Sequence, residues 1–534
     1  MSEGEQGEGM EENRPVAVLA AEGYGLWLPV VLALVAGLLM FAAFPPADLG
    51  GLAWLALALL FFAIAQCRKA SWGALAGFAF GMAFYIPLMS YIGRYGIIAL
   101  VALGVFEGVF TAAFGYLATY VNRLARPGIR IVATAGLWVL VEYLRVHRGP
   151  ISNSLGSAYY SQWSELPLLQ LASIGGGHLI TFFMALVGAA LATVAGAWVP
   201  AKLYRTEEMG PRYALQAART MVIVYVLLFG GYFWGAWAYH DGEKVMAAAD
   251  EEKGCRVGYA QAVVPMGEHT LLKDVNASVD GYFGLTETLP EGLDLIVWPE
   301  TALPTVIETR PDLQARLADV ARKRLCWFLA GVNEFAPEGR LKNTLLLFDP
   351  KGNVVDKYSK VHLVPFGEYV PFRERFKDFW SKFPVRPFDY APGDGFKVLQ
   401  AGNIKIGPLI CFEGLFGQYA RELCRKGAEV LVYATSDAWA QGTYEIQQHT
   451  RTAVVRAVEA RRYVVRVGTD GQSMVITPFG DELGVLEIGK PGVERETVFP
   501  IDELSFYHKY GDAPLMLLCA ALWVAAMVEA VRKG

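Results

Sequence analysis

The sequence has few of the residues that build metal centres, disulfide frameworks and nucleotide-binding loops. Its 534 residues include seven histidines and six cysteines, and neither Cys-x-x-Cys nor His-x-x-x-His occurs. We therefore expect no metal site. The cysteines are scattered (positions 67, 255, 326, 411, 424 and 519), which is not the pattern of a disulfide framework. No Walker loop or Gly-x-Gly-x-x-Gly is present, which fits an expectation of no cofactor.

Charge is also scarce. Only 19% of the residues are charged and 54% are hydrophobic, and the mean hydropathy is +0.32. A soluble enzyme of this length would be less apolar, so membrane spans are expected. The net charge of −5 and the lack of a basic stripe with interleaved aromatics argue against a nucleic-acid partner.

Eight apolar runs are long enough, or nearly so, to be transmembrane helices. Seven precede a long polar block and one follows it. They are Leu26–Phe44, Leu49–Gln66, Trp72–Gly93, Gly96–Val121, Ile131–Leu144, Leu171–Val199, Thr220–Tyr239 and Ala513–Val531. The residues before them, 1–25, are acidic and Gly-rich, and we expect a disordered tail that lacks the features of a signal peptide.

Basic residues set the expected orientation of these spans. The short run Ile131–Leu144 contains Glu142, but basic clusters at 123–130 and 202–219 should both face the cytoplasm, so two crossings must separate them. Both termini are then inside, and the polar block is outside, which is the periplasm if the chain comes from a Gram-negative bacterium. The inside residues are Arg14, Arg68, Lys69, Arg123, Arg126, Arg130, Lys202, Arg205, Arg212, Arg219, Arg532 and Lys533, and the outside ones are Arg94, Arg145 and Arg148.

The polar block, 254–498, alternates short β-rich runs with helical patterns, which predicts an α/β domain with its own core. The expected organisation is a seven-helix membrane domain over 26–239, a linker over 240–253, this domain, and an eighth span over 513–531. The expected strands are Leu293–Trp298, Trp327–Gly331, Thr344–Phe348, Ile404–Cys411, Val430–Thr435, Tyr463–Gly468 and Met474–Thr477, and two expected helices are Pro311–Arg324 and Thr443–Arg462.

Three stretches of this block carry reactive groups where strands end. Glu300 follows an apolar strand in Val-Trp-Pro-Glu, Lys360 begins Lys-Val-His-Leu-Val-Pro-Phe-Gly-Glu-Tyr-Val-Pro, and Cys411 ends a buried strand before a helical run. A thiol beside a helix N-terminus favours the thiolate form. Strand ends gather working residues in α/β sheets. Here Glu300 could take the thiol proton, Lys360 could stabilise an oxyanion, and Cys411 could carry an acyl group.

These stretches resemble the Glu–Lys–Cys signature of the nitrilase superfamily. The sequence motif from Lys360 to Pro371, which follows the predicted membrane spans, resembles that of the bacterial apolipoprotein N-acyltransferases. The resemblance implies an α-β-β-α sandwich outside the membrane. It implies transfer of an acyl chain from a phospholipid, through a cysteine thioester, to the α-amino group of a diacylglyceryl-cysteine at the N-terminus of an apolipoprotein. It assigns Glu300 as base, Lys360 as oxyanion partner and Cys411 as nucleophile, with no metal.

The resemblance also assigns supporting positions and leaves others open. Glu368 matches a second functional glutamate, and Phe412 and Glu413 flank the nucleophile, where the family usually has Tyr-Glu. Glu413 is read equally as an orienter of Lys360 or as a structural ion-pair partner. Departures at Phe412, Gly417, Ser436, Ala440 and Asp470 bear on the choice of donor or acceptor, and the preferred phospholipid and acyl length stay open.

Two other classes of function stay open beside this one. A membrane-anchored nitrilase-like C–N hydrolase or amidase would use water in place of the amine, but eight spans are excessive for an anchor. A non-catalytic lipoprotein-binding relative would not need Glu300, Lys360 and Cys411 together. Within the spans, Glu107 is either functional or a hydrogen-bonded inward carboxyl. The outer arginines, Arg94 and Arg145 among them, are read as interfacial.

Overall fold

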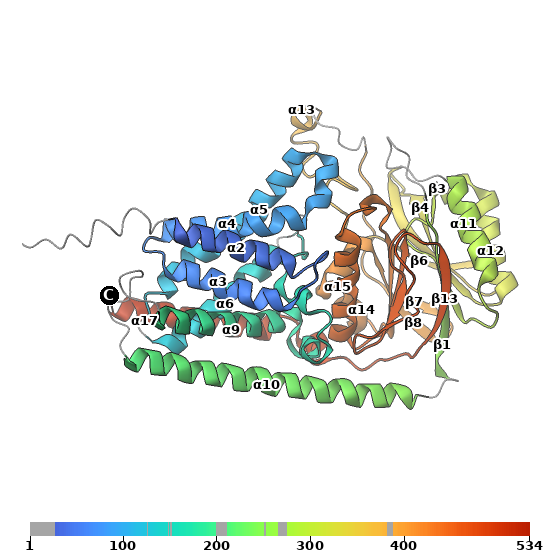
Figure 1. The fold of residues 1–534 in the computed structure, drawn as a ribbon. Coiled ribbons are helices and arrows are strands. Elements are labelled where there is room, and N and C mark those ends of the chain that lie inside the picture. Colours follow the sequence, from blue (N-terminus) through green and yellow to red (C-terminus); the bar gives the residue numbers. More distant parts are fainter. Residues whose placement is uncertain are drawn as a thin grey trace, which may run out of the picture.

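The computed structural model describes residues 27–124, 126–147, 149, 152–198, 211–249, 253–264, 275–381 and 388–533. Within them, helices form the N-terminal half and the C-terminal end of the chain, and two β-sheets lie between (Figure 1). The predicted tail, 1–25, lies outside the described residues.

Apolar helices pack into a bundle at one end of the molecule (Figure 1). Leu and Ala dominate them, and these are strong helix formers. Pro29 and Pro127 lie in first turns, where proline is tolerated because its missing N–H would be unpaired anyway. The helices are α2 (Leu28–Ala42), α3 (Gly51–Ala65), α4 (Ala70–Leu88), α5 (Ile97–Val121), α6 (Pro127–Val146), α9 (Gly177–Trp198), α10 (Pro211–Ala247) and α17 (Ala513–Lys533).

Short helical turns connect the bundle on the side of the sheets. They are η1 (Ser90–Tyr95), η3 (Ala158–Gln162), α7 (Leu166–Leu169) and α8 (Ala172–Gly175). The predicted span Leu171–Val199 is wrong at its start, because Gly176 has a φ of 68° and ends α8 before α9 begins. A left-handed glycine is a common helix terminator.

Four of the described helices are long and apolar enough to cross a membrane, namely α4, α5, α9 and α10. Helices α2 and α3 and the apolar part of α17 (Ala513–Glu529) are shorter. Helix α6 contains Arg130, Glu142 and Arg145 and is in neither group. A helical region with four candidate spans is therefore shown, while eight crossings stay a prediction.

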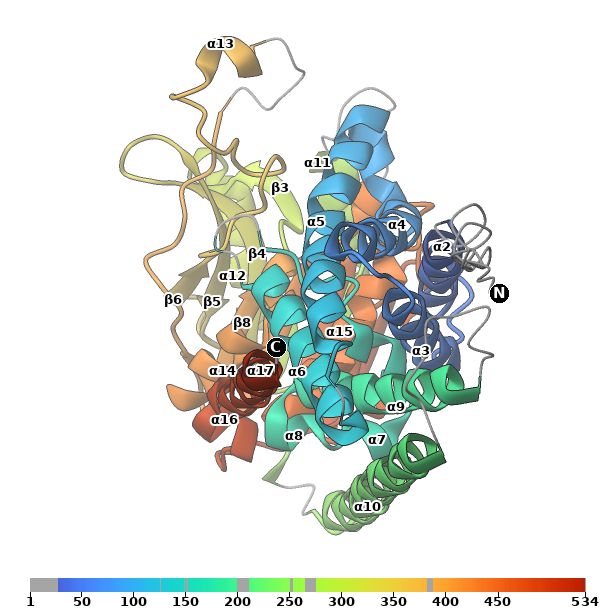
Figure 2. The same cartoon turned by 90° about the vertical axis from the view of Figure 1, so that its left-hand side faces the viewer.

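Helix α10 corrects the predicted linker. It continues without a break through residues 240–247, which we expected to be linker, and it begins at Pro211, before the predicted start at Thr220. Figure 2 shows α10 at the edge of the bundle. Its apolar side chains are more than half exposed at Val222, Phe233 and Trp237. In a bilayer these side chains would meet lipid, which explains how an apolar face persists without a protein partner.

Helices α4 and α5 approach each other through glycines. A Cβ atom on Gly77 would lie 2.1 Å from the carbonyl oxygen of Thr111, and one on Gly115 would lie 2.0 Å from that of Gly73. Both contacts are too short for any side chain. Small residues at such crossings are typical of helices that pack within membranes.

Two sheets make the α/β part of the chain. The first has the order β13-β1-β2-β4-β5-β6, with β3 paired to β4, and the second has the order β12-β11-β10-β9-β8-β7. The strands are β1 (Cys255–Gln261), β2 (Leu295–Val297), β3 (Leu303–Val306), β4 (Trp327–Phe335), β5 (Leu341–Phe348), β6 (Val354–Ser359), β7 (Leu399–Ala401), β8 (Ile404–Ile410), β9 (Val430–Ser436), β10 (Val464–Thr469), β11 (Met474–Ile476), β12 (Glu482–Leu483) and β13 (Gly492–Val498).

The sheets stack between two helical layers (Figure 1). Helices α11 (Val275–Thr288) and α12 (Pro311–Arg324) lie on the outer side, and α14 (Gly417–Arg425) and α15 (Glu445–Ala460) lie between the second sheet and the bundle. All seven predicted strands and both predicted helices are present, and the α-β-β-α order is confirmed. The sequence reading missed the short strands β3, β7 and β12, and it missed β1, β6 and β13, whose mixed polar residues obscure the β pattern.

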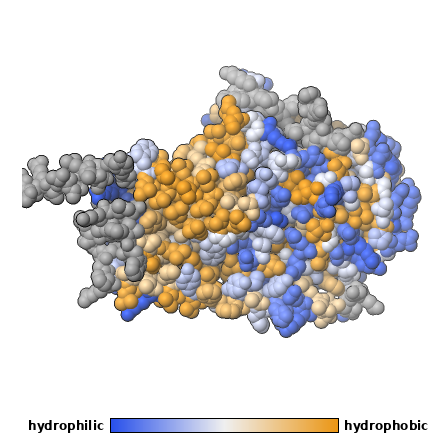
Figure 3. Space-filling model, viewed as in Figure 1, coloured by the Kyte–Doolittle hydropathy of each residue, from blue (hydrophilic) through white to orange (hydrophobic). Residues whose placement is uncertain are grey.

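The surface divides along the same line. Figure 3 shows hydrophobic residues over the helical bundle and hydrophilic ones over much of the α/β part. A broad apolar surface of this kind is unfavourable in water and favourable in a bilayer. The bundle is therefore the part that a membrane would hold, with the sheets at its surface.

Candidate active site

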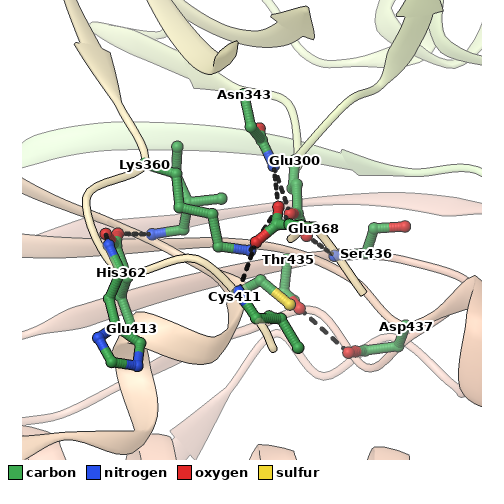
Figure 4. A network of polar contacts seen from close by, with 12 residues as sticks. Glu300, Asn343, Lys360, His362, Glu368, Cys411, Glu413, Thr435, Ser436 and Asp437 are labelled. Atoms are coloured by element: carbon green, nitrogen blue, oxygen red, sulfur yellow. Dashed lines mark hydrogen bonds and ion pairs between the residues drawn. The ribbon is translucent and has the colours of Figure 1, made fainter. Parts of the chain in front are cut away.

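The three predicted reactive residues all follow strand ends, from two different sheets. Glu300 lies just after β2, Lys360 directly after β6, and Cys411 directly after β8. Glu300 and Lys360 are buried, and Cys411 is partly exposed. Figure 4 shows the cysteine sulfur beside the acidic and basic groups. Face-to-face packing of the sheets thus brings together residues that are far apart in the sequence.

Glu300 is oriented by three hydrogen-bond donors. Its Oε1 accepts from Asn343 Nδ2 at 2.6 Å and from Lys360 Nζ at 3.2 Å, and its Oε2 accepts from the backbone N–H of Ser436 at 2.8 Å. Gly331 allows β4 to pass this turn closely, since a Cβ there would lie 2.1 Å from the Pro299 carbonyl oxygen. The carboxylate is therefore held in one position before any substrate arrives.

Lys360 is shared between two carboxylates. Its Nζ lies 3.2 Å from Glu300 and 3.1 Å from Glu368, and Glu368 accepts the backbone N–H of Val364 at 2.9 Å. Burial alone would lower the pKa of Lys360, but Glu300 and Glu368 outweigh it and hold this pKa well above its ordinary value. The ammonium is thus a fixed positive charge at the site.

Cys411 begins a short 3-10 turn, η6 (Cys411–Leu415), rather than an α-helix. Its φ is 53°, a left-handed value that is uncommon for residues with a side chain. Helix α14 starts only at Gly417, so the predicted helix-dipole effect on the thiol is wrong. Although part of the residue stays exposed, the surrounding protein desolvates the Cys411 thiol and so raises its pKa well above the ordinary value; Glu300 raises this pKa further, and Lys360 lowers it. The raised pKa favours the protonated thiol over the thiolate.

Glu413 holds the chain on both sides of the site. Its Oε1 accepts the backbone N–H groups of Val361 at 2.7 Å and His362 at 3.0 Å. Its Oε2 accepts from Ile410 N at 2.8 Å and from the Tyr358 hydroxyl at 2.9 Å. Burial raises the pKa of Glu413 to about 7. Glu413 thus ties the residue after Lys360 to the residue before Cys411 and forms no ion pair among the contacts described.

Phe412 contributes an apolar wall. Its ring stacks at 5.9 Å from His362 and lies edge-on at 5.4 Å from Phe416. Burial, together with nearby Lys360, lowers the pKa of His362 to about 4, so this imidazole is neutral at physiological pH. Tyr419 lies with its hydroxyl 2.9 Å from His362 Nδ1. The aromatic cluster of Phe412, His362 and Phe416 beside the Cys411 turn therefore carries no charge at neutral pH.

One cluster of the described residues offers metal-binding atoms. Asp437, Glu445 and His449 bring a carboxylate oxygen, a second carboxylate oxygen and a ring nitrogen within 4.8 Å of one another. However, Arg466 already places its guanidinium 2.7 Å from Asp437 Oδ2, and both ring nitrogens of His449 have polar neighbours. A cation would have to displace these contacts, so we assign the cluster to a charge network.

The sequence reading missed Asn343, which contacts both Glu300 and Glu368. Its Nδ2 lies 2.6 Å from Glu300 and 3.4 Å from Glu368. The residue belongs to β5, whose predicted start was Thr344. The only signal in the sequence was a polar residue near the start of an apolar strand, and such a residue does not indicate which side chains it contacts.

Ser436 and Asp470, two positions where the sequence departs from the usual residues of the family it resembles, keep their local contacts. At Ser436 the bond to Glu300 comes from the backbone N–H, which is independent of the side chain. Asp470 has a φ of 58°, which Asp and Asn tolerate better than most residues, and its carboxylate accepts the N–H of Val264 at 3.2 Å. Neither change removes a contact from the Glu300–Lys360 pair.

The helical bundle contacts the turn that begins at Cys411 directly. Ser154 and Tyr160 both donate hydroxyl hydrogens to the carbonyl oxygen of Leu415, at 2.8 and 3.0 Å. Arg94 donates to the carbonyl oxygen of Trp439 at 2.7 Å and to that of Gln441, on the loop after β9. The bundle therefore borders the site as well as anchoring it.

Arg145 corrects the interfacial reading. It is 1% exposed and lies 3.4 Å from Glu107 Oε2 inside the bundle. It also donates to the carbonyl oxygens of Asn153 and Leu155, at 3.2 and 3.0 Å, and to the Ser157 hydroxyl at 2.9 Å. Glu107 is thus an inward carboxyl. Its partner Arg145 stabilises the loop that carries Ser154 through hydrogen bonds to the carbonyl oxygens on either side of it.

A buried Glu–Lys pair beside a strand-end cysteine, in a double-sheet domain carried on apolar helices, defines a membrane-bound protein with a carbon–nitrogen hydrolase domain. The sequence pattern of the carbon-nitrogen hydrolase family matches residues 256–490. That of the apolipoprotein N-acyltransferase N-terminal domain matches residues 36–190. A relative that is 30% identical over 94% of this chain is also an apolipoprotein N-acyltransferase, so the chain belongs to the apolipoprotein N-acyltransferase family.

Similar proteins of known name support that membership over nearly the whole chain. The apolipoprotein N-acyltransferase of Geobacter metallireducens is 30% identical over 531 residues, which cover 94% of this chain and 96% of that protein. The apolipoprotein N-acyltransferase of Azotobacter vinelandii is 30% identical over 537 residues, with 95% and 97% covered.

Among solved structures, part of the chain is similar to an amidase from Nesterenkonia. A mutant of this nitrilase-superfamily amidase has a TM-score of 0.36 and 21% identity, and the match covers 49% of this chain and 96% of the amidase.

Proposed function

We propose that this protein N-acylates apolipoproteins, by moving an acyl chain from a membrane phospholipid to the α-amino group of an N-terminal diacylglyceryl-cysteine through a thioester on Cys411. Family membership over almost the entire chain supports the overall reaction. The observation that carries the chemistry is the position of Cys411 at the end of β8, beside the buried pair of Glu300 and Lys360.

In the first half-reaction, Glu300 accepts the proton of the Cys411 thiol as the sulfur attacks the ester carbonyl carbon of the phospholipid. The carbonyl oxygen becomes negative in the tetrahedral intermediate, and the Lys360 ammonium stabilises that charge. The C–O bond then breaks, and the alkoxide of the departing lysophospholipid takes the proton from Glu300. The products are a thioester and a neutral alcohol.

In the second half-reaction, the α-amino group of the acceptor attacks the thioester carbon. Lys360 again stabilises the oxyanion, and Glu300 accepts the proton that the amine loses. The C–S bond breaks, the amide leaves, and Glu300 returns the proton to the sulfur of Cys411. A thiolate is a leaving group that an amine can displace, so the two halves form a ping-pong cycle.

The environment of Cys411 supports a base-dependent route. Burial and Glu300 keep the pKa of the thiol above its ordinary value, so the proton must be removed as the sulfur attacks. Glu300 is oriented for this by Asn343 and the Ser436 N–H. Glu368 supports the reaction by positioning Lys360, while Phe412 and Glu413 shape the turn that presents the sulfur.

The helical region supports a placement at the inner membrane of a bacterium. We propose that residues 26–239 and 513–531 cross it eight times and that residues 254–498 form the catalytic domain on the periplasmic side. The excess of basic residues in the loops and tails assigned to the cytoplasm supports this orientation. Both lipid substrates reside in the bilayer, so a catalytic domain fixed to its surface can reach them.

The test is to incubate purified protein with a phospholipid that carries a labelled acyl chain. We expect a hydroxylamine-sensitive adduct on Cys411, released as an N-acylated product when a diacylglyceryl-cysteine peptide is added. Cys411→Ser should form no adduct. Cys424→Ser, which removes a buried thiol on α14, should behave as the parent protein. Release of free fatty acid alone, with or without peptide, would show a hydrolase and refute the transferase.

A further inference from the structure

The carbonyl group of Cys411 has a partner on the helical layer that faces the bundle. His449, on α15, lies with its Nε2 3.2 Å from the backbone carbonyl oxygen of Cys411. Cys411 has a φ of 53°, and such conformations cost free energy unless surrounding contacts impose them. This contact therefore acts on the residue that carries the nucleophile and at the point where its backbone is least favourable.

The other ring nitrogen of His449 faces a carboxylate. Nδ1 lies 3.1 Å from Asp437 Oδ1. The same oxygen accepts from the Thr435 hydroxyl at 3.0 Å, while Oδ2 accepts from Arg466 at 2.7 Å. Asp437, Arg466 and His449 are all nearly inaccessible to solvent. The imidazole thus lies between a backbone carbonyl and a fixed, buried carboxylate.

Both neighbours of the ring are hydrogen-bond acceptors. The carbonyl oxygen of Cys411 has no proton to give, and an ionised Asp437 has none either. A neutral imidazole has one N–H. In either neutral tautomer, the unprotonated ring nitrogen, which is itself an acceptor, would therefore face an acceptor oxygen. Only the imidazolium satisfies both contacts. Its two N–H groups then point to Asp437 and to Cys411.

The charges around the ring are consistent with this state. Burial alone would raise the pKa of Asp437, but Arg466 and His449 lower it below its ordinary value. Burial would lower the pKa of His449, but Asp437 and Glu445 outweigh it and Arg466 opposes them, so the pKa is raised. Burial raises the pKa of Glu445, on α15, to about 7.

We propose that His449 is a positioning residue for acyl transfer, whose doubly protonated ring, fixed by Asp437, holds the Cys411 peptide in its left-handed conformation. The inference rests on the proposed thioester chemistry, because it concerns how the nucleophile is aimed. His449 makes no contact with the sulfur among the described interactions. Its effect is on the geometry from which the sulfur attacks, so it should alter the rate of acylation more than the affinity for lipid.

Two substitutions separate the contacts of the ring. His449→Asn retains an amide near the Nδ1 position and removes the donor to Cys411, whereas His449→Gln retains an amide N–H near the Nε2 position. We expect His449→Asn to lower kcat for acylation by about 10- to 100-fold, since a hydrogen bond from a charged donor is lost, with KM for the phospholipid changed by less than about twofold. His449→Gln should recover most of that loss.

The protonation state can be measured separately. Nitrogen-15 chemical shifts of labelled histidine, assigned to His449 by comparison with His449→Gln, should show both ring nitrogens protonated at neutral pH. A neutral tautomer would overturn the proposal. Thermal unfolding in detergent identifies any variant that has lost its fold. The kinetics of His449→Asn and His449→Gln are then compared only if both variants are folded. If His449→Asn fails to fold, Asp437→Asn gives the second test, because it removes the charge that keeps the ring protonated.

The outcomes distinguish this inference from the reaction itself. If the parent protein forms no acyl adduct on Cys411, the proposed function fails. If the parent forms the adduct and folded His449→Asn forms it at the same rate, the function stands and the positioning role is refuted. Equal losses of kcat in the Asn and Gln variants would also refute it, because a role through the Cys411 carbonyl requires Gln to rescue.

Discussion

Tyr160 donates its hydroxyl hydrogen to the backbone carbonyl of Leu415, over 3.0 Å, and so joins the helical bundle to the turn that begins at Cys411. Ser154 donates to the same carbonyl oxygen at 2.8 Å. Both donors lie on the segment that Arg145 and Glu142 support from within the bundle. The helical bundle thus contributes to the geometry of the turn that carries Cys411.

Replacing Tyr160 by phenylalanine should loosen this connection. The change removes one of two donors to Leu415 and leaves the ring in place, so we expect a loss of about 1 kcal/mol in stability and a fall in kcat of about fivefold. Adding Ser154→Ala should cost more than either change alone. Thermal unfolding and steady-state kinetics measure both effects. Tyr232→Phe, on α10, is the control, and an unchanged kcat in the double variant would disprove the connection.

The buried pair of Arg145 and Glu107 should matter more for stability than a surface pair. Arg145→Met removes the cation beside Glu107 and the donors to the Asn153 and Leu155 carbonyl oxygens. Breaking a buried pair on one side costs about 3–5 kcal/mol. Unfolding in detergent should show a loss of that size, partly recovered by adding Glu107→Gln.

Arg126 supplies the matched comparison. It pairs with Glu529 at 3.4 Å, and its side chain is 70% exposed. We expect Arg126→Met to change stability by less than about 1 kcal/mol. If the two arginine variants were equally stable, the burial of the Arg145 pair would have no energetic consequence.

The sequence predicts the reactive residues better than their surroundings. Glu300 and Cys411 end apolar strands, and a strand end with a reactive group is visible in one dimension. The contacts of Asn343 and His449 could not be identified. Those of Asn343 join residues that follow other strands of the first sheet, and those of His449 join α15 to Asp437 and to the turn after β8. Lys360 was found by its motif, although the strand before it, β6, is too polar to be recognised.

The membrane part shows the same limit. Hydropathy located the helices, but Arg145, which lies near the end of α6, was misread as interfacial, since charge alone does not reveal an inward partner such as Glu107. It also ended α10 at Tyr239, because the polar residues that follow resemble a linker. The polar residues after Tyr239 nevertheless continue α10 to Ala247, because the helical backbone hydrogen bonds do not depend on the polarity of the side chains. The turn at Cys411 likewise depends on the Glu413 contacts, which no local pattern specifies.

Glu413→Gln should disturb the Lys360 loop. Each carboxylate oxygen of Glu413 accepts two donors, so an amide in either orientation sets its NH2 group against N–H or O–H donors. We expect a loss of about 1–3 kcal/mol together with a lower kcat. Unfolding and kinetics measure these. Glu422→Gln, at an exposed pair with Lys426 on α14, is the control and should be nearly neutral.

The same variant should change the pH dependence of stability. Burial raises the pKa of Glu413 from 4.5 to about 7, so between these values the folded chain holds a proton that the unfolded chain has lost. Stability in the parent should therefore fall as the pH rises through this window. Glu413→Gln cannot titrate and should lack that component. A parallel pH profile in both proteins would contradict the assignment.

Alkylation of Cys411 by iodoacetamide should report the charges around the thiol. The rate follows the thiolate fraction. Burial and Glu300 raise the thiol pKa, so reaction at neutral pH should be slower than for an ordinary cysteine and should rise about tenfold for each pH unit. Glu300→Gln removes a charge that raises this pKa and should speed alkylation. Lys360→Met removes the charge that lowers it and should slow alkylation.

Both variants should nevertheless lose acyl transfer, because one lacks the base and the other lacks the oxyanion partner. The opposite changes in alkylation rate distinguish an electrostatic role from misfolding of the site, because a misfolded site would change the alkylation rate in the same direction in both variants. Cys411→Ser gives the background from the other thiols, and Cys255, Cys326 and Cys424 should contribute little, since burial raises the pKa of each to about 12. Slower alkylation in Glu300→Gln would show that Glu300 does not act on the Cys411 thiol.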